Sequence, residues 1–76
     1  MRVHVYLRQS LFVLPGDAGH IPANAAILVG TLVEQGPLGV TVKADTFKDE
    51  KGRPLQGGAR TLIVPAAKID HVWIEG

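Results

Sequence analysis

The chain has no cysteine, so it can form neither a disulfide nor a cysteine-based zinc site. No apolar stretch approaches the ~18 residues that a membrane-spanning helix needs. Three polar residues, Arg2, His4 and Arg8, interrupt the N-terminus before an apolar signal segment can form. The sequence therefore predicts no membrane span and no secretory signal. Together with the lack of cysteine, this gives the cytoplasm as the expected location.

Charge of one sign is not in excess either. Eight Lys and Arg stand against seven Asp and Glu, and the formal net charge of +1 is far from the strongly basic profile that indicates nucleic-acid binding on charge alone. The apolar fraction of 46% is enough for a packed core and too high for a disordered chain. We expect a single domain over residues 1–76, stabilised by apolar packing, by association with other copies, or by both.

Short alternating or apolar segments, separated by turn residues, run along the chain. Between residues 2 and 8, Val3, Val5 and Leu7 fall on one face, and the residues between them are polar or aromatic, which predicts a half-buried strand. Gly30 interrupts an apolar run and predicts a bend or a close backbone approach. Further strands are predicted over residues 27–34, 40–45, 61–64 and 69–75, with a second hairpin over 47–55 around Gly52 and one turn of 3₁₀ helix at 65–68. Five or six short strands with almost no helix predict an all-β barrel or sandwich.

A long connection follows the first strand. Residues 11–14 are apolar and predicted to be extended, and residues 15–26 form a loop with two Pro and two Gly. Loops of this length in small domains are often functional, so this is one expected partner surface. Asp17 and His20 lie three residues apart in it, but no nucleophile accompanies them, and a structural role in the loop is the favoured interpretation.

The last predicted strand carries apolar groups on both faces. Asp70, Val72 and Ile74 share one face, and Ile69, His71 and Trp73 share the other. A barrel interior accepts only one of these faces. The other must either lie under the long loop or meet another molecule, and in the second case His71 and Trp73 form a subunit interface.

No catalytic constellation can be drawn from the sequence. The three His residues are far apart and lack metal-ligand spacing, Ser10 is the only serine and has no triad partners, and Gly57-Gly58 lacks the P-loop pattern. We therefore expect no enzyme, no cofactor, no metal and no small-molecule substrate. The candidate binding residues are those of an aromatic and basic segment in the first strand and of a basic rim further along the chain: His4, Tyr6, Arg8, Lys48, Lys51, Arg53 and Arg60.

The order of these strands resembles that of an Sm-like small barrel, within the broader SH3-like class. The matching segments are Val3-His4-Val5-Tyr6-Leu7, Gly30-Thr31-Leu32, Gly39-Val40-Thr41-Val42, and Leu62-Ile63-Val64 through Ile69-Asp70-His71-Val72. The resemblance implies a five- to six-stranded barrel with one 3₁₀ turn before the last strand and a tendency to form rings. A PRC-barrel-like domain, another small barrel that serves in assembly, matches these features equally well.

The residues that give the Sm-like family its nucleotide pocket are not present. Counted from Gly30, the family's Asp falls near Gly36 and its base-contacting Asn near Val40, and neither Arg-Gly nor Tyr-Lys-His stands around Val64-Pro65-Ala66. The family's N-terminal helix is also missing from the pattern. We therefore expect a non-enzymatic barrel that self-associates and binds RNA or a protein partner through other surfaces. The alternative is an assembly domain that binds protein only.

Overall fold

The computed structural model describes residues 1–9 and 24–75, so the predicted extended segment 11–14 and most of the loop 15–26, including Asp17 and His20, lie outside the described residues. Six strands are present: β1 (Arg2–Leu7), β2 (Ile27–Gly36), β3 (Gly39–Lys48), β4 (Pro54–Leu55), β5 (Arg60–Pro65) and β6 (Ile69–Ile74). The 3₁₀ turn η2 (Ala66–Lys68) precedes the last strand. Within the described part of the chain, no helix is long and apolar enough to cross a membrane.

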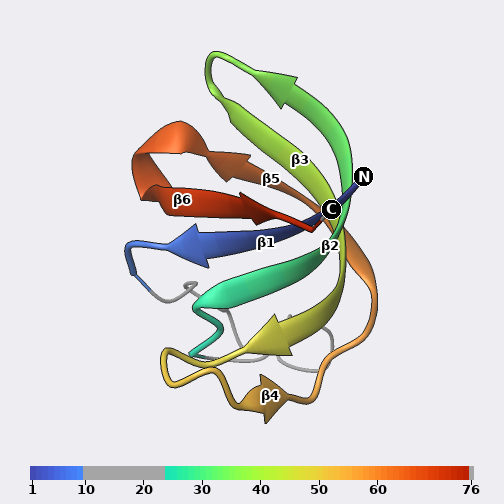
Figure 1. The fold of residues 1–76 in the computed structure, drawn as a ribbon, viewed down its shortest axis with the longest axis vertical. Coiled ribbons are helices and arrows are strands. Elements are labelled where there is room, and N and C mark those ends of the chain that lie inside the picture. Colours follow the sequence, from blue (N-terminus) through green and yellow to red (C-terminus); the bar gives the residue numbers. More distant parts are fainter. Residues whose placement is uncertain (10–23, 76) are drawn as a thin grey trace.

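All six strands belong to one antiparallel sheet, which curls into a half-barrel (Figure 1). The strand order is β4-β3-β2-β1-β6. β5 also pairs with β3, along the same edge of β3 as β4. η2 carries the chain from β5 back to β6, which lies along β1 (Figure 1). The predicted all-β fold with one 3₁₀ turn before the last strand is confirmed.

The core forms on the inner, concave face of the sheet. Its largest fully buried side chains are Phe47, Leu28, Val3, Val5 and Val42. They come from β1, β2 and β3, where alternate residues point inward as the sequence pattern predicts. These three strands are the central members of the sheet, and Val64 of β5 and Ala25, just before β2, complete the buried cluster.

Gly30 marks the sharpest irregularity in β2. A Cβ atom at this position would overlap the carbonyl oxygen of Lys43 and lie 2.7 Å from the Cα of Ala44. The register between β2 and β3 shifts beside it, and Asp45 is the extra residue on β3. The close backbone approach predicted at Gly30 is therefore confirmed.

One predicted boundary is wrong. β3 does not end at residue 45; it continues to Lys48 and places the fully buried Phe47 in the core. The bulge at Asp45 shifts the alternation by one residue, which made Phe47 look like the start of a separate hairpin. The second hairpin exists but is shorter, because only Pro54–Leu55 pairs with the end of β3, around the turn that contains Gly52 at φ +81°.

Candidate functional site

β6 forms one edge of the described sheet. It pairs with β1 in the register Val3↔Ile74 and Val5↔Val72, and the amide of Glu75 donates to the carbonyl of Arg2 at 3.0 Å. In an antiparallel pair the hydrogen-bonded residues alternate, so the backbone groups of residues 71, 73 and 75 point toward β1. The N–H and C=O groups of Val72 and Ile74 therefore point away from it, toward an edge with which no other strand of residues 1–9 and 24–75 pairs.

The outer side of β1 and β6 carries four aromatic rings. The rings of His4 and Trp73 meet edge to face with centroids 4.7 Å apart, and those of Tyr6 and His71 stack with centroids 4.3 Å apart and planes 11° apart. We call these four residues the aromatic face. It unites residues that the sequence suggested separately, since His4 and Tyr6 were expected to bind a partner and His71 and Trp73 to form an interface.

The inner side of β6 is also open to solvent. Val72 is 36% exposed and Ile74 is 56% exposed, although both point to the same face as the buried Val3 and Val5. Beside them lies a hollow of about 330 Å³, which we call the mouth of the half-barrel, lined by Met1, Val3, Leu32, Gln35, Val40, Val72 and Ile74. The expectation that the barrel interior buries one face of the last strand is therefore not met at this end.

The start of β6 behaves differently from its end. Ile69, predicted on the face of His71 and Trp73, packs against the core instead. The register shift between Tyr6 and Leu7 brings Leu7 directly opposite Ile69, and this turns Ile69 inward. β6 is thus anchored to the core at its first residue and exposed on both faces after it.

Charged side chains line the end of the aromatic face where β1 begins. Glu75 accepts from His4 at 3.1 Å and lies 3.4 Å from the guanidinium of Arg2. Arg2 in turn makes two hydrogen bonds to Asp45, at 2.9 and 3.0 Å. These hydrogen bonds hold the pKa of Asp45 below its usual value and raise the pKa of Arg2. Arg2 and Glu75 are thereby held in place beside the aromatic face.

Two arginines expected to bind a partner have contacts within the chain. The Nε of Arg8 donates to the carbonyl of Ile69 at 3.1 Å. The Nε of Arg53 donates to Asp49 at 3.0 Å, and the same carboxylate accepts the backbone amides of Arg53 and Lys51, each at 2.9 Å. The backbone hydrogen bond from Arg53 is the main reason that the pKa of Asp49 is lowered.

The remaining basic residues are spread over two parts of the sheet. Lys48 lies on the outer face in one row with Ile27 and Tyr6, two strands away from β1. Arg60 begins β5 and pairs with Ala44, on the other side of β3. The basic rim is therefore not one continuous patch with the aromatic face. Lys48 is the rim residue that lies at the same level of the sheet as Tyr6, with Ile27 between them.

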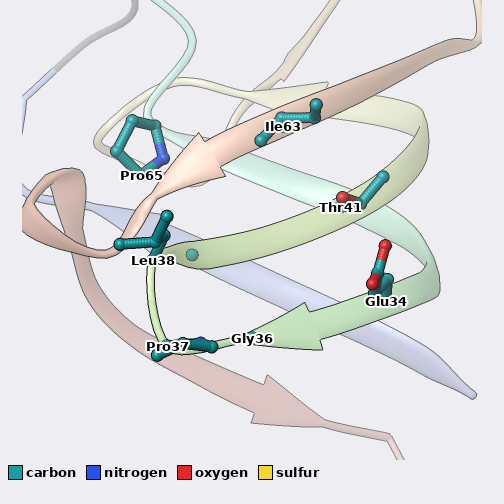
Figure 2. Close-up of a pocket in the computed structure, with 8 residues that line it drawn as sticks. Glu34, Gly36, Pro37, Leu38, Thr41, Ile63 and Pro65 are labelled. Carbon is teal, nitrogen blue, oxygen red and sulfur yellow. The ribbon is translucent and has the colours of Figure 1, made fainter.

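A second hollow lies at the tip of the β2–β3 hairpin (Figure 2). It measures about 400 Å³ and is lined by Glu34, Gly36, Pro37, Leu38, Gly39, Thr41, Ile63 and Pro65. Leu38 is 86% exposed and Ile63 is 80% exposed. The sequence did not suggest this surface, because residues 61–64 formed a continuous apolar run in which the outward Ile63 could not be told from the buried Val64.

Within residues 1–9 and 24–75, no three His, Asp or Glu side chains lie close enough together to hold a metal ion. His4 and His71 share the aromatic face, but each ring lies against a different aromatic side chain. Comparisons with protein-family models, with curated proteins and with solved structures give no match to this chain.

Proposed function

We propose that this chain is a non-enzymatic small barrel whose role is assembly, and that it self-associates through β6. The observation that carries the proposal is the edge of β6 that faces away from β1. There, outward backbone groups coincide with exposed apolar side chains on both faces of the strand. An edge strand of this kind is a ready template for pairing with another strand. Apolar side chains gathered at one exposed place also indicate a protein interface.

The part of β6 after its bulge at Asp70 has neither of two residues that commonly protect an edge strand. Lysine and proline are the residues that most often prevent strand pairing, and neither occurs between Ile69 and Ile74. Pro65 and Lys68 both stand before the strand begins. The exposed half of β6 is thus open to pairing, whereas its start is anchored beside η2.

The curled antiparallel sheet is compatible with the finer Sm-like, SH3-like or PRC-barrel-like relationships suggested by the sequence, and these remain part of the proposal. In each case the partner that the β6 edge suits is a protein strand. A cytoplasmic location belongs to the same proposal and rests on the absence of cysteine.

Binding of RNA is the other function expected from the sequence, and the contacts favour it less. One ring face of Tyr6 is already stacked on His71, and Arg53 is paired with Asp49. Base stacking needs a free aromatic face among basic residues, and Lys48 is the one basic side chain of the rim that shares a strand row with Tyr6. Protein assembly is therefore the favoured role.

Sedimentation velocity at protein concentrations from about 1 to 300 μM tests the proposal, with absorbance at 260 and 280 nm recorded together. We expect an oligomer that dissociates on dilution and contains no nucleic acid. Ile74→Ser should shift the equilibrium toward monomer, whereas Val33→Ser, an equally exposed position on β2 (59%), should leave it unchanged. A wild-type monomer at every concentration would overturn the proposal, and nucleic acid co-migrating with the protein would favour the RNA role.

A further inference from the structure

The outward groups of β6 restrict how a second copy can pair with it. Val72 and Ile74 present their N–H and C=O groups to the edge, because residues 71, 73 and 75 use theirs toward β1, whereas Asp70 is the extra residue at the register shift and falls outside this alternation. In an antiparallel pair, two residues can exchange hydrogen bonds only if both present these groups. The two-fold axis that relates two copies of β6 can therefore pass through residue 71, 72 or 73. In each of these registers an even-numbered residue of one copy lies opposite an even-numbered residue of the other.

These three registers differ in which side chains meet. When the two-fold axis passes through residue 71, Val72 lies opposite Asp70 of the second copy. When it passes through residue 72, Ile74 lies opposite Asp70 of the second copy. In both arrangements one member of the pair is Asp70, the extra residue at the register shift, whose carboxylate lies 3.4 Å from the Nδ1 of His71 and which is not in phase with Val72 and Ile74. Both also use more of the start of β6, where Ile69 is packed against the core beside η2.

The register centred on Trp73 has neither disadvantage. On the inner face it places Val72 opposite Ile74 of the second copy, so the two exposed apolar residues beside the mouth cover each other. On the outer face Trp73 meets its own counterpart, and His71 lies opposite Glu75 of the second copy. Cross-strand aromatic pairs and imidazole–carboxylate pairs each stabilise such a contact.

The other edge of the half-barrel fits β6 less well. The amide of Ala66 donates to the carbonyl of Leu38, so on β5 the outward backbone groups belong to residues 61, 63 and 65, whose side chains lie on the outer face. Antiparallel pairing would place the outer-face Ile63 opposite the inner-face Val72 of a second copy, joining the outside of one sheet to the inside of the next. Pro65 further removes one donor from this edge.

From this matching we infer that two copies pair through β6 in a two-fold, antiparallel register centred on Trp73, which extends the sheet across both copies. This inference rests on the proposed self-association and adds the symmetry and the register. The two aromatic faces then lie side by side on the outer surface, and the two mouths open on the same side of the extended sheet. The repeating unit of any larger assembly is this dimer.

Single cysteines test the register, because the chain has none of its own. Residues that face each other as a non-hydrogen-bonded pair have Cα atoms about 4.5 Å apart, which lies within the range that a disulfide spans. Trp73→Cys should therefore form a covalent dimer under mild oxidation faster than His71→Cys or Val72→Cys. Val33→Cys, exposed on β2, is the matched control and should not cross-link.

A charge series avoids dependence on a variant that lacks Trp73. His71→Glu places a second carboxylate opposite Glu75 twice per dimer and should weaken the dimer about fivefold, whereas His71→Lys should strengthen it by a similar factor. Faster cross-linking at residue 71 or 72 would overturn the register. A wild type that self-associates without any of these cross-links, and without a response to the charge series, would overturn the two-fold symmetry and leave the proposed assembly role standing. A wild-type protein that is monomeric at every concentration would overturn both the register and the proposed assembly role.

Discussion

The same sheet has two unlike ends. At one end, the first residues of β2, Ile27 to Gly30, are all buried, and Phe47 of β3 is fully enclosed. At the other end, β2 runs from Thr31 to Gly36 with only Leu32 partly buried, beside the exposed Val72 and Ile74. We refer to these as the closed end and the open end.

Inward-pointing apolar residues occur at both ends, so the sequence pattern by itself does not decide what is buried. On β1 and β6 burial follows the number of neighbouring strands, although Val64 on the edge strand β5 is also buried. Val5 has β2 and β6 as neighbours, whereas Ile74 has β1 alone among the described strands. The closed end therefore supplies stability and the open end supplies a surface, and substitutions at the two ends should separate these roles.

The largest effect is expected at the closed end. Phe47→Ala removes a fully buried ring and should lower the free energy of unfolding by about 3–5 kcal/mol. Leu38→Ala, at an 86% exposed position, should change it by less than about 0.5 kcal/mol. Urea denaturation followed by circular dichroism measures both. Similar costs for the two variants would show that the core is not where we place it.

Gly30 is the next most sensitive position. Gly30→Ala forces its new methyl group against the backbone of Lys43 and Ala44, which should destabilise the fold by about 1–3 kcal/mol. Gly36→Ala, in the same strand, meets no atom within 4 Å and serves as the control. Thermal melting of the two variants compares them. A Gly30→Ala variant as stable as wild type would mean that β2 and β3 do not approach as closely as described.

The turn between β3 and β4 should respond to acid. The pKa of Asp49 is lowered in the folded chain, so its contribution to stability is present above its unfolded pKa of about 3.9 and is lost as the pH falls through the lower folded value. Asp49→Asn should therefore destabilise the protein at pH 7 and show a smaller further loss between pH 4 and pH 2. Glu50→Gln, in the same turn, is the control for the measurement, which is denaturant unfolding as a function of pH. An unchanged acid dependence in Asp49→Asn would contradict this assignment.

The smallest effect on folding is expected at the open end. Ile74→Ser replaces an inward-pointing residue that is 56% exposed, so the unfolding free energy of the dilute monomer should change by less than about 1 kcal/mol. The same variant should weaken self-association, as described above. A loss comparable to that of Phe47→Ala would show that the open end belongs to the core.

Much of the fold follows from local sequence. Period-two alternation located β1 and the first half of β3, a continuous apolar run located β5, and the composition around Gly30 and Gly52 located the close approach and the turn. The extent of β3 and the inward turn of Ile69 did not follow, because both depend on bulges that appear only when two strands pair. Local pattern cannot specify such register shifts.

The candidate site was predicted in pieces. His71 and Trp73 were assigned to an interface, and His4 and Tyr6 to a binding surface, from separate segments. Their union into one aromatic face depends on the pairing of β1 with β6, a contact between the two ends of the chain. The exposure of Val72 and Ile74 also depends on this arrangement, and the sequence, which left β6 either under the long loop or at an interface, did not predict it.

Amide hydrogen exchange at Val72 and Ile74 tests the central claim most directly, because their N–H groups point away from β1 toward the open edge. If β6 mediates self-association, these two amides should exchange rapidly in dilute protein and become protected as the concentration rises, while the amides of Val3 and Val5, bonded within the sheet, stay protected throughout. Rapid exchange at Val72 and Ile74 at every concentration, in a sample that sedimentation shows to be oligomeric, would contradict the account.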